Sequence, residues 1–157
     1  MRKRLISAKP RDRVSFNEGG LDLADLGMVE ITSEDEAYPI ECALQLGEGG
    51  GWRAAEPGPQ IIRLLFDQAQ ELKHIWLVFE ENEIQRTQEF ALRWSPDHGR
   101  SFREIVRQQW NFSPPGTVLE TEDYTVDLSD VTVLELRILP DQSGGEARAS
   151  LASLRLA

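Results

Sequence analysis

Apolar and polar residues alternate with a period of two along many short segments of the chain from residue 60 onward. Successive side chains of a β-strand point to opposite faces, so this alternation predicts strands. No stretch of ten or more residues shows a helical period, and turn-forming residues separate the segments. The expected strands lie near residues 61–66, 72–79, 89–95, 106–112, 132–138 and 149–156.

The segment 72–79 is apolar on both of its alternating faces, which is typical of a strand in the middle of a two-sheet stack rather than at an edge. Many short strands at regular spacing favour a sandwich or jelly roll over an α/β fold. We therefore predict an all-β, jelly-roll β-sandwich of two antiparallel sheets with about eight strands.

The first part of the chain carries weaker signals. Residues 1–28 scatter prolines and glycines among charges, so we expect a weakly structured N-terminal segment followed by the sandwich at 29–157, in a single domain 1–157. Val29 and Ile31 indicate a first short strand. Ser33 and Glu36 have the spacing of a capping box, which predicts a brief helical turn near 34–38.

Two loops have clearer signatures. The glycine-rich run Gly47–Gly51 ends any regular element before it. The string Ser95–Phe102, SPDHGRSF, lies between two expected strands. Ser and Asp side chains accept hydrogen bonds from nearby backbone N–H groups, and Gly99 can adopt a positive φ, so the string predicts a hairpin turn. One such string is not a propeller signature, which needs several copies.

The charge balance narrows the ligand classes. The chain has 157 residues, enough for one domain with a real core, and its 27 acidic residues against 17 Lys plus Arg give a net charge of −10. A surface of that sign repels phosphate backbones and anionic lipid, so neither nucleic acid nor membrane is expected as a partner. The single cysteine, Cys42, and the lack of a signal-like apolar stretch behind the basic start lead us to expect a cytoplasmic protein.

Catalytic signatures are absent from the sequence. His74 sits in an apolar strand and His98 at the tip of a turn, and no nucleophile–base motif is recognisable around Cys42 in the sequence. The Gly47–Gly51 run lacks the Lys-Ser/Thr that follows in a phosphate-binding loop, and no metal-ligand spacing of Cys or His occurs. We expect no enzyme activity and no cofactor.

Four strings resemble the galactose-binding-like (discoidin, or coagulation factor 5/8 type C) family in the family's order. They are GWRAAEPGPQIIRLLF at 51–66, the strand 72–79, EFALRWSPDHGRSFREI at 89–105 and LELRILPDQSGGEARASLASLRL at 134–156. The resemblance implies an eight-stranded jelly roll and, by analogy, a module that binds carbohydrate.

The family often carries a structural calcium, and this chain departs from the pattern at both acidic positions. Ala43-Leu44-Gln45-Leu46 stands where the loop has Asp, and Ser153 stands where the closing strand has Glu. Calcium needs six to eight oxygen ligands including carboxylates, so we expect no metal site of that kind. A different site from Glu34, Asp35, Glu36 and Glu48 is less favoured than a solvated acidic loop.

Ligands of jelly-roll modules meet the loops at one end of the sandwich. The candidate ligand-binding residues are therefore Trp52, Arg53, Asn111 and Asp141, which the pattern places in loops. For Trp52 the alternative is a lid that packs over the end of the core. The expected function is non-catalytic carbohydrate binding, and the alternative is a cytoplasmic protein-interaction or assembly domain without a sugar ligand. The sequence does not indicate an oligomeric state.

Overall fold

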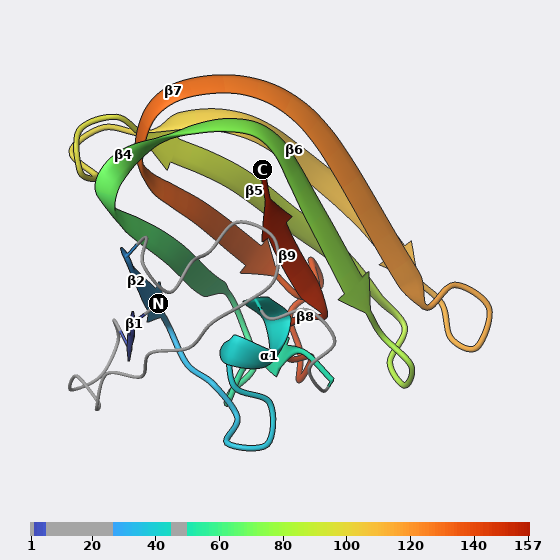
Figure 1. Cartoon of the computed structure of the whole chain (residues 1–157). Coiled ribbons are helices and arrows are strands. Elements are labelled where there is room, and N and C mark those ends of the chain that lie inside the picture. The colour runs from blue at the N-terminus through green and yellow to red at the C-terminus, as the bar shows by residue number, and fades with distance from the viewer. Residues whose placement is uncertain (1, 6–26, 45–49) are drawn as a thin grey trace.

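The computed structural model describes residues 2–5, 27–44 and 50–157. Within these ranges the chain forms nine strands and one short helix (Figure 1). The elements are β1 (Arg2–Leu5), β2 (Gly27–Ile31), α1 (Glu41–Leu44), β3 (Trp52–Arg53), β4 (Gln60–Glu80), β5 (Arg86–Ser95), β6 (Arg103–Phe112), β7 (Leu119–Leu139), β8 (Ser150–Leu151) and β9 (Ser153–Leu156).

Two strands of 21 residues each, β4 and β7, form the frame of the sandwich. They pair antiparallel from Gln60↔Ile138 to Glu80↔Leu119, with register shifts between Leu65 and His74 where both strands bend. Figure 1 shows the two strands curving together, so that each contributes to two layers. The first layer has the order β1-β2-β4-β7-β5-β6, and β9 joins the far half of β4 in the second layer.

The core lies between the two layers. In β4, every second side chain is buried at residues 60–66 and again at 75–79, as the predicted period of two requires. Phe79 from the second layer contacts Phe90 from the first, with ring centroids 5.1 Å apart. The far half of β4 pairs with β7 on one side and β9 on the other, which confirms the central position predicted for segment 72–79. The all-β sandwich architecture is confirmed.

The structure differs from the sequence predictions at several elements. The strands expected at 61–66 and 72–79 are one continuous bent strand, and the N-terminal half of β7 was not predicted at all. β1 at residues 2–5 pairs parallel with β2, which neither the weakly structured N-terminal segment nor the all-antiparallel arrangement anticipated. The remainder of segment 1–28, apart from the start of β2, lies outside the described residues.

The predicted helical turn at 34–38 is replaced by a tight turn at Asp35–Tyr38, and the helix begins only at Glu41. The capping box does not form because Ser33 Oγ is used elsewhere. It donates to Gln60 Oε1 at 2.8 Å and accepts from the backbone N–H of Ala55 at 3.0 Å. No described helix is long and apolar enough to cross a membrane.

The hairpin turn predicted at residues 95–102 is confirmed. Ser95 Oγ accepts the backbone N–H of Gly99 at 2.9 Å, and Asp97 accepts both the N–H of Ser101 at 2.9 Å and its hydroxyl at 2.6 Å. The Ser95 hydroxyl also donates to Asp97, at 2.7 Å. The hydrogen bonds that Asp97 accepts, from Ser101 first and from Ser95 second, hold its pKa well below its ordinary range. Gly99 has the predicted positive φ, of 89°.

Candidate functional site

The loops at one end of the sandwich gather the candidate residues. The connections that follow β4, β6 and β7 lie at this end together with the short β3–β8 sheet (Figure 1). The four residues predicted from the sequence divide into two neighbouring hollows here. Trp52 and Arg53 line the first, and Asn111 and Asp141 line the second.

The first hollow has a volume of about 290 Å³. Arg53 stands in its wall with its guanidinium 5.0 Å from the centre of the Tyr38 ring, and its backbone N–H donates to the Tyr38 carbonyl at 3.1 Å. Gly51 has a φ of 83°, and a Cβ there would lie 2.5 Å from the Leu151 carbonyl, so only glycine lets β3 approach β8 this closely. The complete lining is Tyr38, Gly50, Trp52, Arg53, Glu80, Glu81, Asn82, Glu83, Ser150, Leu151 and Ala152.

Trp52 is part of the core rather than an exposed platform. Its side chain is 1% exposed, and its indole N–H donates to the Ser33 carbonyl at 3.0 Å. A buried indole with a satisfied N–H packs behind the hollow and offers no free face to a ring. The packing alternative therefore describes Trp52, whereas Arg53 remains the accessible member of the pair.

The β4–β5 turn separates the two hollows, and one carboxylate holds it in shape. Glu81 accepts the backbone N–H groups of Glu83 at 3.0 Å and Ile84 at 3.2 Å, and the Arg86 Nε donates to it at 2.7 Å. Burial opposes ionisation of Glu81, but these hydrogen bonds outweigh it and lower its pKa. The hydrogen bonds to Glu81 therefore hold the backbone of the turn in one conformation, and the exposed Asn82 projects from this turn.

The second hollow has a volume of about 600 Å³ and is lined by Gln85, Arg86, Thr87, Asn111, Phe112, Ser113, Asp141 and Ser143. Asn111 Oδ1 accepts the Thr87 hydroxyl at 2.8 Å. Asp141 accepts the Ser143 N–H at 3.1 Å and its hydroxyl at 2.9 Å, which closes the loop on itself. Both predicted residues therefore have side-chain oxygens held at the rim.

Arg86 lies beneath this hollow with no exposed side-chain surface. Its Nη1 donates to the Pro140 carbonyl at 2.8 Å and to Gln88 Oε1 at 3.0 Å, and its guanidinium lies 4.8 Å from the centre of the Phe112 ring. One side chain thus joins the loops after β4 and β7 to the end of β6. Sequence reasoning missed Arg86, because nothing in a lone arginine at a strand start distinguishes a buried one from an exposed one.

A buried carboxyl group continues this polar chain into the sandwich. Gln88 Nε2 donates to Glu120 Oε1 at 3.2 Å, and Glu120 is completely buried. Burial is the main cause that raises the pKa of Glu120 to about 9, and Glu122 beside it acts in the same direction. Gln88 and Arg86 oppose the shift only partly. Glu120 is therefore neutral at pH 7.

Among the described residues, no group of three His, Cys, Asp or Glu side chains comes together as a metal site. Glu34 accepts the backbone N–H of Ile40 at 2.9 Å and pairs with Lys3, and Asp35 accepts the N–H of Ala37 at 2.9 Å. These carboxylates organise their own loop. Glu48 lies outside the described residues.

Comparison with solved structures places the fold. No protein-family model matches the sequence, and no curated protein does. A pectin-binding carbohydrate-binding module aligns with a TM-score of 0.57 and 14% identity over 83% of this chain and 89% of its own. The family 32 module of Clostridium perfringens NanJ, solved with galactose, aligns with a TM-score of 0.58 and 15% identity, over 85% of this chain and 94% of its own. The family 32 module of AlyQ, solved with 4,5-unsaturated mannuronic acid, aligns with a TM-score of 0.59 and 16% identity, over 85% of this chain and 95% of its own.

Each similarity extends over most of both chains, so the correspondence is one of whole domains. The fold implied by the four sequence strings is confirmed: this chain has the galactose-binding-like β-sandwich of family 32 carbohydrate-binding modules.

Proposed function

We propose that this domain is a non-catalytic carbohydrate-binding module that holds a neutral sugar unit in the first hollow. The observation that carries the proposal is the position of Arg53, fixed over Tyr38 beside Glu80 and Asn82 at the loop end of this fold. The similar solved structures are carbohydrate-binding modules, which supports the same function.

The hollow contains the groups that sugar recognition needs. A sugar hydroxyl is both donor and acceptor, and here a guanidinium offers donors, a carboxylate offers acceptors and an amide offers both. Arg53 ends β3, Glu80 ends β4 and Asn82 lies in the turn after β4, and all three line one space. Glu80, Glu81 and Glu83 surround it with negative charge, which disfavours an acidic sugar and favours a neutral one.

The second hollow extends the site. It lies on the other side of the Glu81-anchored turn, and Asn111 and Asp141 hold further oxygens at its rim. A second unit of an oligosaccharide that crosses the turn would meet these groups. A monosaccharide would then bind more weakly than a disaccharide or trisaccharide of the same sugar.

A glycan array of neutral glycans, followed by calorimetric titration of any ligand found, tests the proposal. Loss of a hydrogen bond to a charged group weakens binding about tenfold or more, so Arg53→Ala should do so, and Asn82→Ala should weaken binding by a smaller factor. Gln68→Ala, at the exposed bend of β4 far from the loops, is the matched control and should bind normally. A blank array, or normal binding by Arg53→Ala, contradicts the proposal.

The protein-interaction alternative has less support in the structure. In the described part of the chain the exposed large apolar side chains are Ile84 and Leu119, at 44% and 50%. Two such residues do not make the contiguous apolar patch expected of a protein interface. The cytoplasmic location expected from the sequence stays a prediction.

A further inference from the structure

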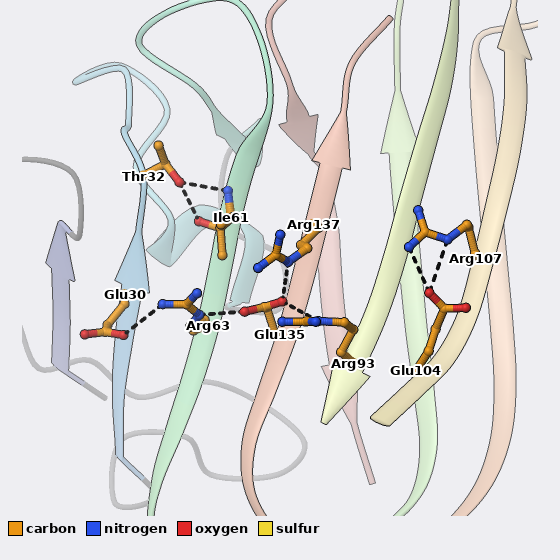
Figure 2. A network of polar contacts seen from close by, with 9 residues as sticks. All are labelled: Glu30, Thr32, Ile61, Arg63, Arg93, Glu104, Arg107, Glu135 and Arg137. Carbon is orange, nitrogen blue, oxygen red and sulfur yellow. Dashed lines mark hydrogen bonds and ion pairs between the residues drawn. The ribbon is translucent and has the colours of Figure 1, made fainter. Parts of the chain in front are cut away.

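A row of alternating charges crosses the outer face of the first layer, away from the loop end. Its members occupy consecutive register positions on six neighbouring strands. Figure 2 shows the central part of the row and the side chains that join its members. The row is Arg4, Glu30, Arg63, Glu135, Arg93 and Glu104.

Glu135 lies at the centre of this face with no exposed side-chain surface, and three arginines share its carboxylate. The Nε atoms of Arg63, Arg93 and Arg137 donate to it at 2.6, 2.8 and 2.6 Å. One negative charge therefore holds three positive charges in place. The geometry leaves a local excess of positive charge on a chain whose net charge is −10.

The three guanidinium groups differ in the contacts that they make besides the one to Glu135. Arg63 also reaches Glu30, with Nη1 3.9 Å from Oε1, and Arg93 lies over the Phe102 ring at 4.3 Å. The Nη atoms of Arg137 have no hydrogen-bond partner among the described residues, and its side chain is 46% exposed. Arg137 thus has a fixed Nε and a free outer edge, the edge that binds carboxylates in the bidentate mode.

A groove of about 220 Å³ lies beside Arg137. It exists because Ala91, the residue between Arg137 and Arg107 in the sheet register, has a short side chain. Ile61 lies on the other side of Arg137 and adds apolar surface to the lining. Glu89 and Arg107 also line the groove. Arg107 is held by Glu104 at 2.9 Å and by Glu89 at 3.6 Å, whereas Arg137 shares the single negative charge of Glu135 with two other arginines, so the excess positive charge beside the groove is on the Arg137 side.

We propose that this groove, here called the Arg137 groove, is a second binding site that takes the carboxylate of a uronic-acid sugar unit. Arg137 would bind the carboxylate through its free edge, and the apolar surface of Ile61 and Ala91 would lie against the carbon face of the ring. The proposal does not depend on the neutral-sugar site at the loop end, which shares no lining residue with it.

The position of the groove favours a sugar over an acidic peptide. Extended peptides gain affinity from backbone hydrogen bonds at a sheet edge. The Arg137 groove lies across β4, β7 and β5, whose facing backbone groups already pair with one another. The groove is also smaller than the roughly 300–1,000 Å³ of sites for drug-sized ligands, so it suits one ring. The net charge of −10 would repel a long polyanion, so the ligand is a short oligomer.

The test is titration of the full chain with a trimer of galacturonic acid and with its methyl ester, which keeps the ring and removes the charge. The acid should bind and the ester at least tenfold more weakly, with the difference shrinking at high salt. Arg137→Met should weaken acid binding at least tenfold. Arg148→Met removes the same charge from an equally exposed arginine outside the groove, and should bind as the unmodified chain does.

Arg137→Met should keep its melting temperature within a few degrees, since Arg63 and Arg93 still neutralise Glu135. Equal binding of acid and ester, no binding of the acid, or normal binding by Arg137→Met would overturn the proposal. Binding of oligoglutamate but not of the uronate trimer would overturn it in favour of an acidic peptide. Arg53→Ala separates the two sites: it should weaken neutral-sugar binding about tenfold or more and leave uronate binding unchanged.

Discussion

The neutral, buried Glu120 makes the stability of this domain depend on pH in a direction opposite to that of most carboxyl groups. Its pKa is about 9 in the folded chain, whereas an unfolded chain ionises Glu near 4.3. Between these values the folded state binds more protons than the unfolded state, so stability falls as pH rises. The stability that protonated Glu120 contributes to the folded state is fully present below about pH 4.3 and is lost as pH rises through about 9.

Glu120→Gln removes the titration and keeps the shape of the side chain. The amide can still accept from Gln88 as Glu120 Oε1 does. A group that is protonated when folded and ionised when unfolded changes stability by up to about 1.4 kcal/mol per pH unit. Because Glu122 also interacts with Glu120 and raises its pKa, we expect between half of that value and the full value. Relative to the unmodified chain, the variant should therefore gain about 1–3 kcal/mol between pH 6 and pH 8.

Urea unfolding followed by tryptophan fluorescence at pH 5.5–8.5 measures this difference directly. Comparing the variant with the unmodified chain at each pH cancels the titration of the other groups. Glu56→Gln, which removes an exposed carboxylate from the loop before β4, serves as the control and should leave the pH slope unchanged. If Glu120→Gln loses stability in parallel with the unmodified chain over this range, Glu120 is ionised in the folded state and the reasoning fails.

Two further substitutions test the packing at the site and the hairpin turn. Trp52→Ala should lower the free energy of unfolding by about 3–5 kcal/mol, because the indole is buried and its N–H is hydrogen-bonded. An unchanged midpoint of urea unfolding would contradict the place of Trp52 in the core. Gly99→Ala should cost about 1–2 kcal/mol, since φ is 89° there, whereas Gly116→Ala, at a glycine without positive φ, should cost less in the same thermal melt.

The strand segments that the sequence predicted are those in which most of the inward side chains are apolar. Phe90, Leu92 and Trp94 alternate along β5 and face the core, so the period of two was visible. The N-terminal half of β7 was missed because two of its inward positions are Glu120 and Glu122. Neither residue type signals burial, and only the polar chain from Arg86 through Gln88 makes the position of Glu120 tolerable.

The bend of β4 was missed for a related reason. Four of the five residues 67–71 are polar and resemble the end of a strand, whereas the structure continues through them with shifted register. At the site, Arg53, Asn111 and Asp141 were expected in loops, but Arg53 ends β3 and Asn111 lies in β6, so only Asp141 is in a loop. Their role in ligand binding stays a prediction. Their division into two hollows was not predictable, since it depends on loops far apart in sequence. Tyr38 and Asn82 had no pattern of their own, although Asn82 lies three residues after the end of the predicted strand 72–79.

The shared strands β4 and β7 also determine the order in which the domain can fold. Their pairing joins Gln60 to Ile138 and Glu80 to Leu119, and the whole β5–β6 hairpin lies between them in sequence. The hairpin is local and can form early, but neither layer closes until the chain has returned from it to pair β7 with β4. Because both layers use the same two strands, they should acquire protection from hydrogen exchange in a single step. The loop-end site and the Arg137 groove would then appear together, late in folding.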